Sequence, residues 1–230
     1  MKFLNCLITG ASSGIGKAIS EELSKSARHI YITSRNIKKL EEVHDNIIKN
    51  KCKCTIVPLD LHEDDGIENL AKQIYEKDKF IDVLILSAGI INQLSPVDSI
   101  ELSNIKKIVD LNFLSNFRMI KNFHPLLKNS NGSNLVLISS FKDNSKTHYW
   151  GIYQPIMSAL NELFLYYANE NQNSKIKANI FSPNAVKTGF RESIMPGEDK
   201  NKILTPEEVA VKIVEFIKTT KTTGEIIKFD

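Results

Sequence analysis

Short apolar runs alternate with amphipathic stretches along the whole chain. The apolar runs have the length of buried strands, whereas the stretches between them carry apolar residues at helical spacing, as in Ile15, Ala18, Ile19 and Leu23. This alternation is typical of β-α-β units built around a parallel sheet. We expect strands at residues 3–8, 29–33, 54–59, 81–86, 135–138, 176–181 and 225–229, and helices at 14–25, 36–49, 63–76, 101–127 (one or two), 155–169 and 206–219.

The order of these elements predicts the fold class. Seven strands alternating with about six helices favour an α/β fold, in which a doubly wound, seven-stranded parallel sheet lies between two layers of helices. No internal repeat, low-complexity tract or linker divides the sequence, so we expect a single domain over residues 1–230. Ligands of such folds bind outside the carboxyl ends of the strands, and candidate chemistry is therefore sought there.

The turn after the first strand is rich in glycine. Residues 9–16 read Thr-Gly-Ala-Ser-Ser-Gly-Ile-Gly, between an apolar strand and a helix. A strand that turns directly into a helix gathers unpaired N–H groups and the positive end of the helix dipole in one place, which suits a phosphate. An ordinary strand-to-helix turn is the alternative, but the flanking elements favour nucleotide binding. The candidate nucleotide-binding residues of this turn are Gly10, Ser12, Ser13, Gly14, Ile15 and Gly16.

Composition and charge give no indication of other kinds of partner. The chain has 30 Lys and Arg against 27 Asp and Glu, a net charge of +3 with the signs interspersed, which does not favour nucleic acid. No apolar stretch reaches the roughly 18 residues of a membrane span, and no signal peptide is recognisable, so no membrane partner is expected. The three cysteines, Cys6, Cys52 and Cys54, favour thiols in a reducing compartment over a metal site, and we expect a cytoplasmic protein.

The glycine turn has the form Thr-Gly-x-x-x-Gly-x-Gly, which resembles the signature of the short-chain dehydrogenase/reductase family. The resemblance extends from Thr9 to the last strand. It implies a Rossmann fold that binds a nicotinamide dinucleotide and transfers a hydride between this cofactor and a carbonyl or alcohol. Family members usually form dimers or tetramers through helices that correspond to residues 112–127 and 155–169, so the resemblance implies a homodimer or homotetramer.

Residues after the second strand bear on the choice of cofactor. A fold that prefers NAD usually offers Asp or Glu about 20 residues beyond the glycines for the ribose 2′-hydroxyl, but this chain has Ser34, Arg35 and Asn36 there. The guanidinium of Arg35 suits a 2′-phosphate, as in NADP-preferring family members, although it could be a solvated arginine before a helix. NADP is therefore expected over NAD. The resemblance assigns further cofactor contacts to Asp60, Leu61, Ser87, Ala88 and Gly89.

A serine and a tyrosine form the candidate catalytic pair. Ser140 follows the fifth strand, and Tyr153 stands near the start of the next helix. Reduction of a carbonyl places charge on oxygen, so a proton donor must lie within hydrogen-bond reach. The resemblance implies that Ser140 polarises the carbonyl, that Tyr153 is the general acid or base, and that Asn112 helps a proton relay. Without the resemblance, a strand-end serine and a helix-start tyrosine are commonplace.

The lysine of this family is missing. The family pattern is Tyr-x-x-x-Lys, whereas this chain places Met157 at the lysine position. In the family the lysine holds the nicotinamide ribose and lowers the tyrosine pKa, and methionine offers neither charge nor donor. Loss of a nearby cation is worth about 1–3 pKa units and would slow alcohol oxidation most. Pro155 predicts a helix that begins near Gln154, which would shift Tyr153. If another cation serves, the candidates are Lys142, Lys146 and Lys187.

Residues after the sixth strand complete the candidate site. The run from Pro183 to Thr188 is similar to the Pro-Gly-x-x-x-Thr of the family, with Asn184 in place of the glycine. The resemblance implies that Pro183 and Thr188 contact the cofactor, Thr188 at the nicotinamide carboxamide. Residues 189–204 mix glycine, proline and charges, and we expect either a mobile lid over the substrate or a plain surface loop.

Two functions follow from these residues. The first is an NADP-dependent oxidoreductase acting on a small-molecule carbonyl or alcohol, impaired by the missing lysine. The second is a dinucleotide-binding pseudoenzyme, a sensor or scaffold without turnover. The intact Ser140 and Tyr153 favour the first, and Met157 favours the second. Nothing in the sequence specifies the substrate.

Overall fold

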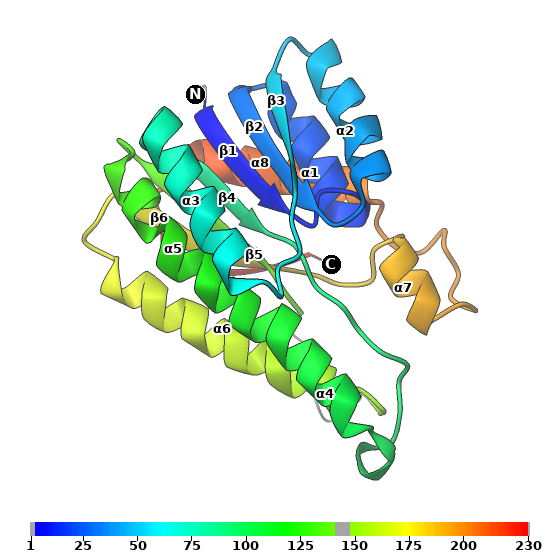
Figure 1. Cartoon of the computed structure of the whole chain (residues 1–230). Coiled ribbons are helices and arrows are strands. Elements are labelled where there is room, and N and C mark those ends of the chain that lie inside the picture. Colours follow the sequence, from blue (N-terminus) through cyan, green and yellow to red (C-terminus); the bar gives the residue numbers. More distant parts are fainter. Residues whose placement is uncertain (1–2, 141–147, 230) are drawn as a thin grey trace.

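The computed structural model describes residues 3–140 and 148–229. Its centre is a seven-stranded, all-parallel sheet in the order β3-β2-β1-β4-β5-β6-β7 (Figure 1). This confirms the predicted doubly wound α/β fold, in which the strand order reverses between β1 and β4. The strands are β1 (Phe3–Thr9), β2 (Ala27–Ser34), β3 (Lys53–Pro58), β4 (Val83–Leu86), β5 (Ser133–Ile138), β6 (Ile176–Pro183) and β7 (Ile226–Phe229).

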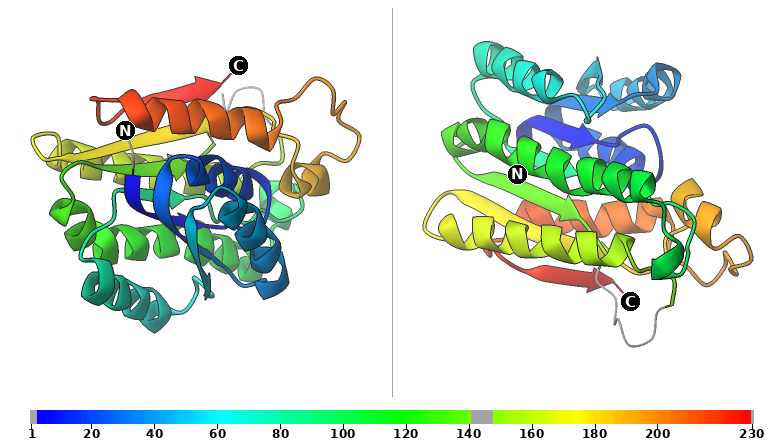
Figure 2. Two further views of the ribbon diagram at one scale, coloured as in Figure 1. Left: turned by 90° about the horizontal axis from the view of Figure 1, so that it is seen from above. Right: turned by 60° about the horizontal axis from the view of Figure 1, so that its bottom comes forward.

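Helices cover both faces of this sheet. They are α1 (Gly14–Ser24), α2 (Ile37–Lys49), α3 (Asp64–Asp78), α4 (Leu102–Ile108), α5 (Ser115–Asn129), α6 (Tyr153–Glu170), α7 (Gly189–Ile194) and α8 (Pro206–Thr219), with a short 3-10 turn η1 (Val97–Ser99). Helices α1, α2 and α8 pack on one face, and α3, α5 and α6 on the other, which gives three layers (Figure 2). Across the described residues, none of these helices is both long and apolar enough to cross a membrane.

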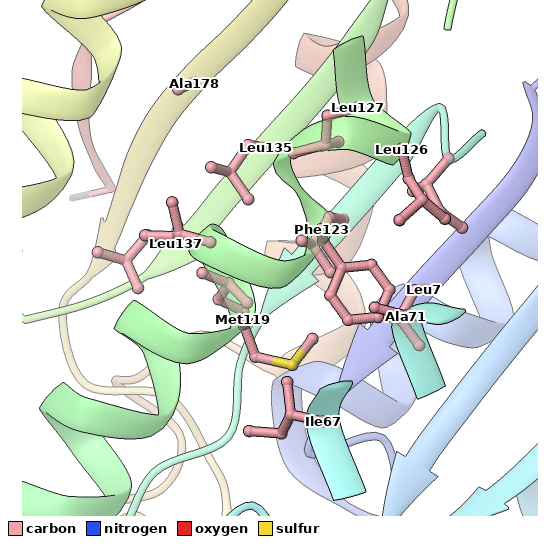
Figure 3. Close-up of a cluster of buried hydrophobic side chains, with 14 of the residues drawn as sticks. Leu7, Ile67, Ala71, Met119, Phe123, Leu126, Leu127, Leu135, Leu137 and Ala178 are labelled. Carbon is pink, nitrogen blue, oxygen red and sulfur yellow. The ribbon is translucent and has the colours of Figure 1, made fainter. Parts of the chain in front are cut away.

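Alternate residues of the central strands pack in two separate hydrophobic cores, because successive side chains along a strand point to opposite faces of the sheet. In β1, Leu7 packs in the layer of α3 and α5, whereas Cys6 and Ile8 pack in the layer of α1 and α8. Figure 3 shows the first core, where Met119 and Phe123 of α5 extend toward α3 and β1. Since both faces are covered, the central strand β4 is apolar and buried along its whole length.

The fourth strand begins later than expected, at Val83. Asp82, just before it, directs its carboxylate at the start of β1 and at the end of α5. Its Oδ2 accepts from the backbone N–H of Leu4 (2.6 Å) and Asn5 (3.2 Å), and its Oδ1 accepts from the hydroxyl of Ser130 (2.6 Å). This buried carboxylate therefore ties together the ends of the strands opposite the candidate site.

Two helical irregularities lie beside the candidate site. The predicted helical region 101–127 is divided by a π-helical turn, η2 (Val109–Leu114), which carries Asn112 between α4 and α5. Helix α6 begins at Tyr153, two residues before the predicted start. Pro155 is tolerated because N–H groups of the first helical turn have no intrahelical partner.

Candidate active site

A cavity of about 600 Å³ opens at the carboxyl edge of the sheet. This volume is ordinary for a small-molecule pocket. The cavity runs from the ends of β2 and β3, past β1 and β4, to the ends of β5 and β6. All the predicted site residues except Gly16 line it: Gly10, Ser12, Ser13, Gly14, Ile15, Arg35, Asp60, Leu61, Ser87, Ala88, Gly89, Asn112, Ser140, Tyr153, Pro183 and Thr188.

The glycine turn is held by close backbone contacts. Gly10 has a φ of +67°, and a Cβ there would lie 2.9 Å from backbone atoms of Ala88. A Cβ on Gly16 would lie 2.4 Å from the backbone oxygen of Gly10, so α1 packs directly against the turn. Thr9 anchors the neighbouring strand end, because its Oγ1 accepts from the backbone N–H of Ser87 (3.1 Å) and Ala88 (3.2 Å). Gly16 therefore shapes the turn by packing and does not line the cavity.

The first turn of α1 faces the cavity. Ser13 is the N-cap residue, in extended backbone, and its side chain makes no capping hydrogen bond. Gly14 and Ile15, the first two helical residues, line the cavity together with it. The N–H groups of a first helical turn have no intrahelical partner and lie at the positive end of the dipole. These residues therefore fit a phosphate or pyrophosphate group.

Two cations lie at the β2 end of the cavity. The side chain of Arg35 is 63% exposed, with its Nη1 3.9 Å from Oδ2 of Asp60. Lys39, in the first turn of α2, lines the same cavity, and its backbone N–H donates to Oδ1 of the N-cap residue Asn36 (3.1 Å). No acidic residue occupies positions 34–36. This end of the cavity thus suits a second anionic group.

Asp60 is oriented by His62, which the sequence reasoning missed. Its Oδ1 accepts from both the backbone N–H (3.1 Å) and the ring Nδ1 (2.7 Å) of His62. Burial acts to raise the pKa of Asp60, but these hydrogen bonds, with the charges of His62 and Arg35, outweigh it and leave the pKa below its usual value. Asp60 is therefore an ionised hydrogen-bond acceptor at neutral pH.

The candidate acid Tyr153 stands at the opposite end of the cavity, between two aromatic rings. Its ring centroid lies 5.9 Å from that of Trp150, edge to face, and 6.0 Å from that of Phe190 in α7. Burial raises its pKa above the ordinary value of 10.0, with no neighbouring charge as a contributing cause. Its hydroxyl has no hydrogen-bond partner among residues 3–140 and 148–229. Tyr153 is therefore a neutral phenol with a proton to donate.

Ser140 is held by two amide side chains of α6. Its Oγ donates to Oε1 of Gln154 (3.2 Å), and its backbone oxygen accepts from Nε2 of Gln154 (3.2 Å) and from Nδ2 of Asn161 (3.3 Å). Oδ1 of Asn161 in turn accepts from the hydroxyl of Ser139 (2.5 Å). Gln154 is 4% exposed and Asn161 is 2% exposed. The end of β5 is thus fixed to α6 by a buried polar network.

Met157 occupies the position of the family lysine inside the cavity wall. It is 5% exposed, and its Sδ lies 3.9 Å from Nδ2 of Asn112. The same amide is paired in both directions with Ile90: Oδ1 accepts from the backbone N–H and Nδ2 donates to the backbone oxygen, each at 2.8 Å. Asn112 therefore fixes the chain after β4, and the predicted relay role is not tested by these contacts.

The alternative cations do not take the place of the missing lysine within the described part of the chain. Lys142 and Lys146 lie outside the described residues. Lys187 is exposed and does not line the cavity. The single lysine among the described lining residues is Lys39, at the opposite end. Tyr153 consequently has no described lysine in its part of the cavity.

The segment predicted as a lid or loop contains a short helix. Thr188 caps α7 by accepting from the backbone N–H of Arg191 (3.1 Å), and its hydroxyl donates to the backbone oxygen of Val186 (3.2 Å). Arg191 also binds both carboxylate oxygens of Glu198, at 2.6 and 2.7 Å. Its charge at the cavity wall is thereby neutralised. Thr188 lines the cavity, and only a lone pair of its hydroxyl is left for a ligand.

Several lining residues, and Gln154 behind the cavity wall, were not foreseen from the sequence. Lys39 had a partial local signal, because it is a cation in the first turn of the helix that follows Arg35. Gln154 is adjacent to Tyr153 in sequence, but nothing local indicated that it reaches Ser140. Asn116, Trp150 and Leu160 line the cavity with no local signal, whereas Phe190 and Ile194 belong to the segment 189–204 that the sequence predicts as a lid or loop.

Known proteins resemble this chain in sequence and in fold. A family model described as short chain dehydrogenase matches residues 5–199. The chain is 31% identical over 193 residues to a protein of Saccharomyces cerevisiae named uncharacterized oxidoreductase YIR035C, a match that covers 82% of this chain and 72% of that protein. Two solved short-chain dehydrogenases, from Shigella flexneri with NADP and from Escherichia coli CFT073 with NADPH, each have a TM-score of 0.90 and 24% identity, over 99% of this chain and 97% of theirs.

Proposed function

The chain belongs to the short-chain dehydrogenase family, and from that premise we propose that it is an NADP-dependent oxidoreductase that transfers a hydride between the nicotinamide and a carbonyl or alcohol. The observation that carries the proposal is one continuous cavity, which joins the cations Arg35 and Lys39 to the hydroxyls of Ser140 and Tyr153. The first turn of α1 lies between these two ends. A dinucleotide enzyme needs an anchor for phosphates at one end and a proton donor at the other.

Preference for NADP rests on the residues themselves. Arg35 and Lys39 supply two positive charges where the ribose 2′-phosphate would bind, and positions 34–36 offer no carboxylate for a 2′-hydroxyl. The matched structures with NADP or NADPH share 24% identity with this chain, so they bear on the fold and not on cofactor choice.

The proposed chemistry divides between cofactor and protein. The nicotinamide supplies or accepts the hydride. Tyr153, as a neutral phenol, donates the proton to the substrate oxygen, where negative charge develops during reduction. Ser140 lies in the same part of the cavity and orients that oxygen. Trp150 and Phe190 flank the tyrosine ring and limit the access of water.

The second candidate function is a dinucleotide-binding pseudoenzyme that acts as a sensor or scaffold. It is favoured by Met157, which supplies no charge, and by the raised pKa of Tyr153. Alcohol oxidation requires the tyrosinate, which is scarce when the phenol pKa lies above 10. Such a protein would retain the cavity and the phosphate-binding turn but turn over little or no substrate.

Binding and turnover, measured separately, distinguish the two functions. NADPH affinity is followed by the fluorescence of the cofactor, and turnover by NADPH consumption against a panel of ketones and aldehydes, for wild type and for Met157→Lys. Wild-type turnover supports the oxidoreductase. Tight NADPH binding with turnover in the lysine variant alone supports the pseudoenzyme. Absence of affinity for any dinucleotide contradicts both.

We also propose that residues 1–230 form a single domain that assembles as a homodimer or homotetramer in the cytoplasm. Exposed aromatic side chains on α5 and α6 support self-association, with Phe117 44% and Tyr166 66% exposed. Light scattering of wild type and of a Phe117→Glu, Tyr166→Glu double variant tests it: the wild type is expected at a multiple of the 26.0 kDa chain mass, and the variant at a lower multiple.

A further inference from the structure

In this structure the hydroxyl hydrogen of Ser140 already makes a hydrogen bond within the protein. Ser140 Oγ donates to Oε1 of Gln154 at 3.2 Å, and a serine hydroxyl has a single hydrogen to give. Two lone pairs remain on Oγ, which lines the cavity. In this arrangement Ser140 offers a ligand an acceptor, whereas polarisation of a carbonyl requires a donor.

The direction of this hydrogen bond is fixed by the neighbouring backbone. An amide can in general be turned over, which exchanges its oxygen and nitrogen. Here the Nε2 of Gln154 donates to the backbone oxygen of Ser140 at 3.2 Å. If the amide turned over, its oxygen would face that carbonyl oxygen, and a buried hydrogen bond would be lost. Nε2 must therefore face the carbonyl, Oε1 must face the hydroxyl, and the hydroxyl must donate.

Among the described residues, no other hydrogen bond competes for this orientation of the Gln154 amide. Gln154 is 4% exposed, so water does not replace its partners. Asn161 Nδ2 also donates to the backbone oxygen of Ser140 (3.3 Å), which holds that carbonyl in place from a second side. The Tyr153 hydroxyl has no partner among the described residues and is a neutral donor. The pair therefore presents one donor, on Tyr153, and one acceptor, on Ser140.

We infer that Gln154 is a specificity-determining positioning residue, and that by holding Ser140 as an acceptor it makes the site complementary to a neutral hydroxyl group. An alcohol oxygen can accept from Tyr153 and donate its own hydrogen to Ser140. A carbonyl oxygen can only accept, so Ser140 would first have to give up its bond to Gln154. The inference rests on the proposed function for the location of the substrate, and it names the ligand class that the site prefers as an uncharged alcohol, which is bound more tightly than its ketone.

The single tryptophan of the chain gives a binding signal that does not depend on turnover. Trp150 lines the cavity next to Tyr153, so its fluorescence reports ligands at this end. Matched pairs of alcohol and ketone, cyclohexanol with cyclohexanone and borneol with camphor, are titrated with and without NADP⁺. The wild type is expected to bind each alcohol about tenfold more tightly than its ketone, the size of one hydrogen bond.

Two variants of Gln154 test the cause of this preference. Gln154→Leu removes the amide oxygen that accepts from Ser140. Gln154→Met removes the same oxygen with an unbranched side chain, and it is used if the leucine variant does not fold. Either change frees the Ser140 hydrogen, and ketone binding is expected to tighten by about tenfold. Ser140→Ala in the same background is expected to abolish that gain. Gln73→Leu, at an exposed position of α3, is the matched control and is expected to keep the wild-type ratio.

The outcomes separate the inference from the proposed function. An alcohol-to-ketone ratio that does not change in either Gln154 variant overturns the inference, as does failure of the wild type to bind either member of both pairs. The proposed function is judged by NADPH affinity and turnover instead. NADPH binding without the predicted ligand ratio would overturn the inference alone. The predicted ratio without affinity for any dinucleotide would overturn the proposed function alone.

Discussion

The thioether sulfur of Met157 lies 3.9 Å from the side-chain nitrogen of Asn112, inside the wall of the cavity. This contact joins α6 to the π-helical turn between α4 and α5, and Met157 stands where the Tyr-x-x-x-Lys pattern of the family has its lysine. The uncharged sulfur thus accepts a weak, buried hydrogen bond and supplies no positive charge to the candidate acid. The chemical consequence lies with Tyr153, whose pKa is raised by burial with no opposing charge.

Replacement of Met157 by lysine should restore that charge. We expect the pKa of Tyr153 to fall by about 1–3 units, because a cation within a few ångströms favours the phenolate. Alcohol oxidation needs the phenolate, so its rate at neutral pH should rise by about 10- to 1,000-fold, while carbonyl reduction changes less. The pH–rate profile of oxidation checks this, since its rise should move to lower pH. Met157→Leu keeps the volume without the charge, and an equal gain in that variant would contradict the prediction.

Removal of the Arg35 guanidinium should weaken NADPH more than NADH. A charge-assisted hydrogen bond is worth about 1.5–3 kcal/mol, so Arg35→Ala should raise the Kd of NADPH roughly 10- to 100-fold and leave that of NADH nearly unchanged. Cofactor fluorescence gives both constants. The matched control is Arg28→Ala, at an exposed position at the other end of β2. An equal rise in the Kd values of NADPH and NADH would show that Arg35 does not bind the 2′-phosphate.

Alanine at position 16 should disrupt the nucleotide-binding turn. A Cβ there meets the backbone oxygen of Gly10 at 2.4 Å, and this contact is with rigid backbone. We expect Gly16→Ala to lower the free energy of unfolding by about 1–3 kcal/mol and to abolish measurable NADPH binding. Gly132→Ala is the control, because a Cβ at Gly132 meets nothing within 4 Å. Urea unfolding and cofactor titration of both variants provide the comparison, and wild-type affinity in Gly16→Ala would refute the packing argument.

Acidification should destabilise the protein through His29, which lies far from the cavity at the start of β2. Burial lowers the pKa of His29 from 6.5 to about 4, against the opposing charge of Asp78, while its Nε2 lies 2.8 Å from the hydroxyl of Thr55. Between pH 6.5 and about 4, the His29 ring is therefore protonated in the unfolded chain but neutral in the folded chain. The free energy of unfolding falls as the pH drops from 6.5 to about 4.

The loss attributable to His29 should be about 2 kcal/mol, after allowance for partial solvent screening. Urea unfolding at several pH values, for wild type and His29→Gln, measures it as the difference in slope. His44→Gln, on a partly exposed position of α2, should keep the wild-type slope. A slope that is the same in His29→Gln and wild type would exclude His29 as the source.

Local patterns in the sequence predicted the fold of this protein. Apolar runs of strand length, helical spacing such as Ile15 to Leu23, and the glycine turn between them predicted the parallel sheet, its two helical layers and the location of the site. These features depend on near neighbours in sequence, because side-chain periodicity within one element decides which face is buried. The family resemblance added the Ser140 and Tyr153 pair and identified Met157 as the departure.

Only the tertiary structure decided how these residues act together. The orientation of Gln154 depends on the rotation of α6 against the end of β5, and the pairing of Asp60 with His62 and Arg35 depends on how the chain leaves β3 beside β2. The same holds for Met157 against Asn112, which lie on segments far apart in sequence. Hydrogen-bond direction and burial are set by atoms that approach within about 3 Å, and such distances follow from packing between elements and not from periodicity within one.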